Sequence, residues 1–369
     1  NAQTFSGNYQ ALVDPDLSKK LVGKNPFLMG KNLREKIYPI IHSSLHCFYD
    51  GLSWSDCTVY HPKTMLDAIA VDQSEKLIKA YVVPAFSPTQ AFPSPILSHL
   101  PWPKFLYRWT HQISRKLTAT VKSPVKTFLK EKGLKYQGMW QDRPTLYGIS
   151  PRFLPQPNDY PNQHTYTGFW LPEQKAKSLP DELEAILLGP GPSIGIGFGS
   201  MPVHRAEEWP SRCLNILNQT EVKLVVVRAW GLKQVSFPEH PRLFVIDQVP
   251  YEALLPRLDG FIHHGGAGTL AQVLNAGIPQ WICPVLYPLG DQMFWGKRIF
   301  DLGLGPKPKA LKKCSDKDFI LAIENLREAS CIDAAQAMHQ RLKNENGLAE
   351  AVHQVEALMQ GSSALAQFD

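Results

Sequence analysis

Short apolar runs alternate with stretches of helical spacing along most of the sequence. In the second half the apolar runs span 193–198, 223–228, 243–246, 260–263 and 280–284. Helical spacing follows most of them, at 205–217, 251–255 and from 269 and 290 onward, and further helices are predicted over 315–328 and 332–360. Strand-sized apolar runs separated by helices are typical of a parallel sheet that helices cover.

The first half shows the same alternation less regularly. Strands are predicted over 57–62, 80–84, 145–149 and 166–170, and helices over 33–52, 65–71 and 105–135. The fold class is therefore α/β, with two domains. The predicted boundaries are 1–170 for the first domain, 171–192 for a Pro- and Gly-rich linker, 193–345 for the second domain and 346–369 for a C-terminal helix that packs back on the first.

One long stretch, 85–106, is rich in proline and aromatic residues. A long connection without regular structure is usually functional. Three interpretations stay open: its apolar side chains line a pocket, contact lipid, or pack over the end of a sheet. The candidates for an acceptor pocket are Phe86, Phe92, Trp102 and Phe105.

Composition narrows the class of protein. The 369 residues are 44% hydrophobic and 20% charged, which suits a globular chain with a sizeable core. No apolar run reaches the roughly 18 residues of a transmembrane helix. The six cysteines form no C-x-x-C pair, so we expect free thiols in a reducing, cytoplasmic compartment. The chain opens on the polar Asn1, and we expect the native N-terminus to lie upstream of it.

The charge is divided unevenly. Residues 1–150 carry 19 Lys and Arg against 10 Asp and Glu, a net charge of +9, which leaves −3 for the rest of the total of +6. Much of the excess lies over 104–135, close to several aromatic residues. This pattern predicts docking on an anionic membrane, peripheral at its inner face, unless the charges form an ordinary solvated helix face. No nucleic-acid recognition motif is present, so nucleic acid is not an expected partner.

The stretch 260–269 carries the clearest chemistry. It predicts a strand, a turn with three glycines and the start of a helix, where N–H groups and the helix dipole favour phosphate. His264 lies where its imidazole could donate a hydrogen bond to the same anion. The spacing is neither G-x-G-x-x-G nor that of a P-loop, so a generic strand–turn–helix junction is the alternative.

Small and polar residues also follow the other strands of the second half. The ends of parallel strands meet at one edge of a sheet, where ligands bind, so these residues are expected to converge there. Asp291 could instead serve only as a helix N-cap. His263 is expected to be packed or bonded to backbone. Four other histidines show no partner spacing and are treated as structural: His42, His46, His61 and His164.

Three segments resemble the donor-site signature of the GT-B nucleotide-sugar glycosyltransferases, in the branch of the sterol and macrolide glucosyltransferases. They span 198–202, 263–269 and 290–296, with 302–306 after the third. A weaker likeness, over 87–93, is to the acceptor domain of sterol glucosyltransferases. The resemblance implies two Rossmann-like domains facing each other across a cleft, the first of them incomplete. It also implies inverting transfer of glucose from UDP-glucose to the hydroxyl of an apolar acceptor, a sterol or related lipid foremost.

The same resemblance implies a set of donor-binding residues. Ser200, His264 and the first helical turn would form hydrogen bonds to the diphosphate, and Val249 would pack against uracil. Asp291 and Gln292 would bind hydroxyls of the donor sugar. Hydrogen-bond donors of this kind stabilise a leaving diphosphate, so neither a metal nor a cofactor is expected. The full set is Gly199, Ser200, Arg228, Trp230, Val249, His264, Gly266, Gly268, Thr269, Asp291 and Gln292.

The general base is the part of this picture that the sequence does not supply. In the family an Asp or His near the Gly-rich loop after the first strand deprotonates the acceptor, and we expect it upstream of Asn1. Two alternatives therefore stay open. One is the same chemistry on a macrolide or flavonoid aglycone, and the other is a non-catalytic protein that binds a nucleotide sugar or a lipid.

Overall fold

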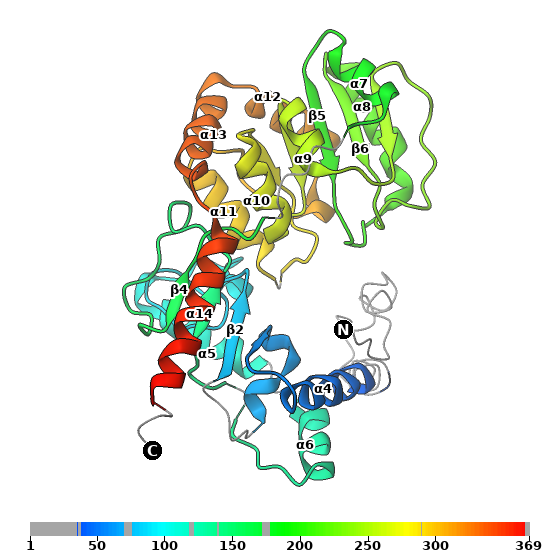
Figure 1. Ribbon diagram of the computed structural model, residues 1–369. Helices are drawn as coiled ribbons and strands as arrows, with labels where there is room; N and C mark the ends of the chain where they lie inside the picture. Colours follow the sequence, from blue (N-terminus) through cyan, green and yellow to red (C-terminus); the bar gives the residue numbers. More distant parts are fainter. Residues whose placement is uncertain are drawn as a thin grey trace. The chain divides into compact units, whose positions relative to one another are not determined.

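The computed structural model describes residue 35 and residues 38–69, 76–117, 122–138, 140–171, 178–288 and 290–365. The chain forms two compact units, each built on a parallel sheet with helices (Figure 1). Unit 1 comprises 1–94, 102–170 and 346–369, and unit 2 comprises 95–101 and 171–345. The predicted α/β class is confirmed. The predicted linker falls within unit 2, and the predicted C-terminal helix falls within unit 1.

The sheet of unit 2 has five parallel strands in the order β7-β6-β5-β8-β9. They are β5 (Ser193–Gly197), β6 (Lys223–Val227), β7 (Leu243–Ile246), β8 (Gly260–His263) and β9 (Gln280–Ile282). In chain order this arrangement reads 3-2-1-4-5, which is a doubly wound sheet. The strand order reverses between β5 and β8, and that point is where such sheets bind ligands.

Alternating side chains give this sheet a core on each face. On one face Ile196 and Val226 pack with α8 (Trp209–Gln219) and α12 (Asp316–Leu326). On the other, Val225 and Phe261 pack with α7 (Asp181–Leu188), α9 (Tyr251–Leu254) and α10 (Ala267–Ala276). Helices thus cover both faces, and a ligand reaches the sheet at its strand ends.

The sheet of unit 1 has four parallel strands in the order β1-β2-β3-β4. They are β1 (Thr58–Tyr60), β2 (Leu77–Tyr81), β3 (Thr145–Tyr147) and β4 (His164–Tyr166). The helices α4 (Tyr38–Leu52) and α6 (Lys122–Glu131) lie side by side and pack through Leu45 and Phe128 (Figure 1). Among the described residues of the unit, the other long helices are α5 (Tyr107–Leu117) and α14 (Gly347–Leu365).

Several predicted elements are wrong in their extent. In the described part of the predicted helix 65–71, residues 65–69, the helical structure is a 3₁₀ turn, Leu66–Ala68, and Met65 before it is left-handed, with φ at 62°. Within the predicted helix 105–135 the described residues form α5 and α6, and α6 ends at Glu131, four residues before the predicted end. The one over 332–360 is divided into α13 (Ala329–Leu342) and α14, and the side chain of Asn346 accepts the Ala349 N–H where α14 begins. Strand β2 begins three residues before its predicted start at 80.

A short piece of the long stretch 85–106 belongs to unit 2. Its 3₁₀ turn η5 (Pro95–Leu97) packs against α11 (Gln292–Asp301). The Lys297 ammonium donates to the Ser98 carbonyl at 2.5 Å. The ring of His99 stands edge-on to Tyr287, with the ring centroids 6.0 Å apart. The second α/β unit is therefore completed by residues that come far ahead of it in the sequence.

Candidate active site

The loops that leave β5 and β8 meet where the strand order of unit 2 reverses. The first loop holds Gly199 and Ser200, and the second holds His264 and Gly266. The His264 ring lies between them: a Cβ added to Gly199 would stand 3.3 Å from its Cε1, and one added to Gly266 would stand 2.4 Å from its Nε2. Both glycines thus make room for this imidazole, and the predicted convergence of these residues is confirmed.

His264 is buried, and its Nδ1 has no hydrogen-bond partner among the described residues. Burial lowers the pKa of its imidazole to about 4, so the ring is neutral at pH 7. A buried polar atom without a partner costs about 1–3 kcal/mol, and such an atom in a native fold calls for an explanation. A ligand that completes the hydrogen bond of Nδ1 would supply one.

Both ring nitrogens of His263, the neighbouring residue, have hydrogen-bond partners inside the fold. Its Nδ1 accepts the Gly265 N–H at 3.2 Å, so the proton is on Nε2, which donates to Gln280 Oε1 at 2.8 Å. Burial, with a smaller contribution from His264, lowers the pKa of His263 to about 3. The prediction that His263 is packed rather than ligand-binding is confirmed.

Helix α10 begins directly after this turn. Its N-cap is Gly266, and no described side chain caps it, so the N–H groups of the first turn point out of the helix without an intrahelical acceptor. A Cβ added to Gly268 would meet nothing within 4 Å, which leaves the first turn open. Gly265 has a φ of 88°, and a Cβ there would come within 2.6 Å of Ile282. The turn therefore exposes the helix start while its own backbone is held tightly.

The loop after β6 is joined to the loop after β5. The Trp230 N–H donates to the Gly199 carbonyl at 3.3 Å. A Cβ on Gly231 would lie 2.3 Å from the Met201 carbonyl, so the two backbones touch there. Ala229 takes a left-handed φ of 44° in this connection. Ser200 and Trp230, predicted from separate strand ends, are thus held at neighbouring positions.

A cavity of about 590 Å³ opens at the ends of β6 and β7. Arg228 crosses it to Asp247, with Nε and Oδ1 2.7 Å apart, and Trp230 forms part of its wall with about half of its surface exposed. The sequence predicted Arg228 and Trp230 here but not Lys233, Asp247 or Gln248, which also line the cavity. Val249 is half-buried against the core of α7 and α9 and is not among the lining residues.

The two polar residues at the start of α11 are already engaged. Asp291 is the N-cap residue of α11, as the alternative expected, but its side chain makes no capping bond, and its Oδ2 instead accepts the indole N–H of Trp295 at 2.9 Å. Gln292 is buried, and its Oε1 accepts the N–H groups of Val285 and Leu286 at 2.7 and 2.8 Å. Only the amide NH₂ of Gln292 is left for a sugar hydroxyl, which narrows its predicted role.

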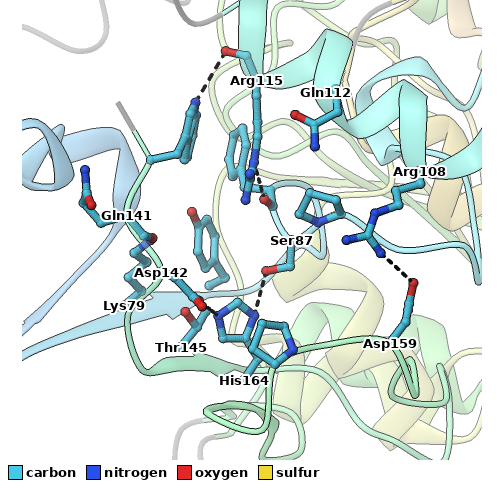
Figure 2. Close-up of a pocket in the computed structure, with 15 residues that line it drawn as sticks. Lys79, Ser87, Arg108, Gln112, Arg115, Gln141, Asp142, Thr145, Asp159 and His164 are labelled. Carbon is cyan, nitrogen blue, oxygen red and sulfur yellow. Dashed lines mark hydrogen bonds and ion pairs between the residues drawn. The ribbon is translucent and has the colours of Figure 1, made fainter. Parts of the chain in front are cut away.

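Unit 1 contains a second cavity, of about 310 Å³, and Figure 2 shows the side chains around it. Ser87 Oγ lies 3.0 Å from His164 Nδ1, and His164 Nε2 lies 3.2 Å from Asp142 Oδ1. The Tyr147 hydroxyl makes a short hydrogen bond to Ser87 Oγ. A consistent chain runs from the Tyr147 hydroxyl through Ser87 to Nδ1, with the Nε2 proton donated to Asp142. The sequence predicted a structural role for His164 without naming these partners, because spacing in the sequence cannot reveal contacts between separate strands and loops.

Charged and aromatic groups surround this chain of hydrogen bonds (Figure 2). Arg108 pairs with Asp159 at 3.5 Å, and the Arg115 Nε donates to the Phe86 carbonyl at 2.9 Å. The Phe86 ring stacks on Trp140 with centroids 4.5 Å apart. Burial lowers the pKa of His164, although the Asp142 carboxylate opposes this effect. The cavity therefore combines an aromatic wall with a mostly polar lining.

Known proteins resemble this chain over both of its units. Residues 219–358 match the family described as the erythromycin biosynthesis protein CIII-like C-terminal domain. Two sterol 3-beta-glucosyltransferases of Arabidopsis thaliana are 34% identical over 220 residues, covering 59% of this chain and 35% of the relative, and 32% identical over 314 residues, covering 82% and 48%. The chain thus spans half or less of the length of these curated relatives.

Solved structures agree on the fold. The glycotransferase of kitacinnamycin superposes with a TM-score of 0.64 at 15% identity, covering 92% of this chain and 85% of that one. SnogD from Streptomyces nogalater gives 0.57 at 17% identity, covering 97% and 86%. The chain has the GT-B fold of the glycosyltransferases. The family resemblance and the fold class expected from the sequence are confirmed.

Among the four acceptor-pocket candidates of this GT-B chain, only Phe86 lines the cavity of unit 1. Phe92 is buried and its ring lies 6.1 Å from that of His111. Trp102 stands edge-on to Trp109, with ring centroids 6.1 Å apart, and Phe105 is 82% exposed. Phe86 therefore fits the interpretation that the stretch lines a pocket and Phe92 the one that it packs inside the fold, whereas Phe105 faces solvent.

The basic segment 104–135 keeps many of its charges in solvent. Lys126 and Lys130 on α6 are exposed, as are Phe105 and Trp109 near the start of α5. Arg115 is instead turned inward to the cavity of unit 1. No helix in the part of the chain that the structure describes is long and apolar enough to cross a membrane.

Proposed function

We propose that this protein is an inverting glucosyltransferase that moves glucose from UDP-glucose to the hydroxyl of a sterol or a related lipid. The observation that carries the proposal is the buried Nδ1 of His264, unpartnered among the described residues, beside the uncapped start of α10 at the switch point of a doubly wound sheet. The sterol 3-beta-glucosyltransferase relatives support the acceptor class.

The chemistry of the leaving group fits this site. Transfer of the sugar leaves negative charge on the diphosphate, and preorganised donors stabilise such charge strongly in a site that excludes water. The neutral His264 imidazole would donate from Nδ1, and the first-turn N–H groups of α10 would donate alongside it. No step in this scheme requires a metal or a cofactor. The uracil and ribose would lie toward Arg228 and Trp230, whose cavity adjoins the loop of Gly199 and Ser200.

Calorimetric titration with UDP and UDP-glucose tests the donor site. Wild-type protein should bind both, and His264→Ala should bind UDP about 10- to 100-fold more weakly, as expected for the loss of a hydrogen bond to a charged group. His353→Ala, a change at an exposed histidine of α14, serves as the matched control and should bind as wild type. Absence of UDP binding, or equal affinities for all three proteins, would refute the donor site.

A second acceptor class has support of its own. The matching family is named after a protein of erythromycin biosynthesis, and one fold neighbour, VinC, was solved in complex with dTDP. A macrolide-type aglycone and a deoxythymidine donor are therefore the second candidate. Titrating UDP against dTDP distinguishes the donors, and product analysis with cholesterol against a macrolide aglycone distinguishes the acceptors. Donor binding without transfer to either acceptor would instead favour the non-catalytic alternative.

Membrane docking is the remaining part of the proposal. Exposed lysines of α6 and the exposed aromatic rings of Phe105 and Trp109 suit an anionic, lipid-containing surface at the cytoplasmic side. Sedimentation with phosphatidylserine vesicles should bring the protein down at low salt. The charge reversals Lys126→Glu and Lys130→Glu should release it, and indifference to both would count against docking.

A further inference from the structure

Helices α4 and α6 bring together two imidazoles and a carboxylate that the glycosyl-transfer scheme does not use. His42 and His46 are one helical turn apart on α4, and both point to Glu131 at the end of α6. The distance from Glu131 Oε2 to His42 Nε2 is 2.8 Å, and to His46 Nε2 it is 3.3 Å. The sequence predicted a structural role for these two histidines, and their shared carboxylate partner comes from a helix far along the chain.

We propose that His42, His46 and Glu131 bind a divalent transition-metal ion, with zinc as the preferred ion. Two imidazoles spaced i, i+4 on a helix with a carboxylate from a second element form the three-ligand set of open zinc sites. Nitrogen and oxygen ligands of this kind also suit copper, nickel and cobalt, which makes the site selective for this class over calcium or magnesium.

The geometry needs only small side-chain movements to close on an ion. The three ligand atoms all lie within 4.8 Å of one another. Ligands at about 2.0–2.1 Å from a tetrahedral zinc stand about 3.4 Å apart, so the most distant pair must approach by roughly 1.4 Å. The side chains of His42, His46 and Glu131 are 32%, 35% and 45% exposed, which leaves them free to rotate and leaves a coordination position for water.

Neighbouring side chains contact the rings without covering them. Both imidazoles stand edge-on to the buried Phe128 ring, at centroid distances of 6.3 Å for His42 and 4.8 Å for His46. Phe128 lies one turn before Glu131 on α6, so the same helix supplies the apolar floor and the third ligand. A bound ion would replace the shared hydrogen bonds and join two helices that lie far apart in the sequence. Its effect would therefore be on the stability of unit 1.

Calorimetric titration of the tag-free, EDTA-stripped chain with ZnCl₂ tests this site. We expect one ion per chain, a rise in Tm of about 5 °C or more at saturating zinc, and the visible absorption of four-coordinate cobalt when Co²⁺ replaces zinc. His42→Ala, His46→Ala and Glu131→Gln should each weaken binding at least ten-fold and remove the rise in Tm. His353→Ala should change neither.

Free thiols are the main competing ligands, and Cys47 adjoins His46 in the sequence. Cys47→Ser and Cys57→Ser should therefore retain one-to-one binding. Far-UV circular dichroism before zinc addition checks that each variant is folded, and the conservative Glu131→Gln keeps the side chain's shape. The proposal is overturned if no saturable one-to-one binding occurs, if Glu131→Gln and both histidine variants bind as wild type, or if a cysteine substitution abolishes binding. None of these outcomes depends on the proposed glucosyl transfer.

Discussion

His264 in unit 2 and His164 in unit 1 are both buried imidazoles at the ends of parallel strands, yet their surroundings differ. His164 has a partner on each nitrogen, Ser87 and Asp142. His264 has no partner for Nδ1 among the described residues and lies beside an uncapped helix start. Burial lowers the pKa of both. The difference teaches that burial keeps a histidine neutral, whereas the unfilled hydrogen bond marks the one that can receive a ligand.

The largest expected effect follows from placing a methyl group against His264. In Gly266→Ala the new Cβ would stand 2.4 Å from Nε2, so the ring must leave its position. We expect UDP affinity to fall more than about 100-fold, since both His264 and the helix start are disturbed. Gly268→Ala is the matched control, because a Cβ there meets nothing within 4 Å and the N–H is kept. Calorimetry that gives the two variants equal affinity would contradict this account of the turn.

The pH dependence of stability provides the next test. In the folded chain the pKa of His264 is about 4, against about 6.5 for an unfolded imidazole. The unfolded chain therefore binds more protons between these values, and the free energy of unfolding falls as the pH drops from about 6.5 toward 4. His264 alone contributes roughly 3 kcal/mol to that loss.

Urea unfolding at several pH values measures this loss, and His264→Gln should remove most of the contribution of His264. His164→Gln should flatten the curve less, because Asp142 favours the protonated form of His164 and opposes the effect of burial. Parallel curves for wild type and His264→Gln would show that the imidazole is not kept neutral by burial.

Substituting His164 and His264 by alanine, one at a time, should affect UDP affinity and the free energy of unfolding to different extents. His164→Ala removes an imidazole with two partners and should lower the free energy of unfolding by about 1–3 kcal/mol without changing UDP affinity. His264→Ala should show the opposite balance, with a smaller loss of stability and a clear loss of affinity, since no hydrogen bond to Nδ1 is broken. Urea unfolding and calorimetry on the same samples provide both numbers. Equal stability losses would remove the distinction between the two residues.

The smallest expected effect comes from making His164 resemble His264. Ser87→Ala deletes the hydroxyl at Nδ1 and leaves that nitrogen buried without its partner. We expect a loss of about 1 kcal/mol in the free energy of unfolding and no change in UDP affinity. Thr127→Ala, an exposed hydroxyl on α6, is the control and should stay within about 0.5 kcal/mol of wild type. A Ser87→Ala protein as stable as wild type would show that the hydroxyl contributes nothing to holding His164.

The sequence predicted the second sheet more accurately than the first for a physical reason. Strands β5, β6, β8 and β9 are buried along their whole length and β7 is half-buried, and all of them read as mostly apolar runs, so their ends are marked clearly. Because parallel strand ends meet at one edge, Ser200, Trp230 and His264 could be brought together before any coordinates were known. In unit 1 the strands are short, and Met65 takes a left-handed conformation that no residue pattern signals.

What the sequence could not predict is how the polar groups are satisfied. The Oε1 of Gln292 is used by the N–H groups of Val285 and Leu286, which only the folded loop places there. His46 and Glu131 are 85 residues apart, and their contact depends on how α4 and α6 pack. Partners of this kind are set by tertiary structure. Whether a histidine binds a ligand or has a structural role can therefore be assigned only when its neighbours in the fold are known.

The segment 95–101 bears on how this protein can be divided. Unit 2 includes residues 95–101, which lie in the sequence between two segments of unit 1. Expressing residues 171–345 alone would remove the Ser98 carbonyl that accepts a hydrogen bond from the Lys297 ammonium. It would also expose the face of α11 that packs against Pro95–Leu97. A stable excised unit 2 would need those seven residues restored, for example as a fused N-terminal peptide. Transplanting this domain into a chimeric enzyme thus means moving two pieces of sequence rather than one.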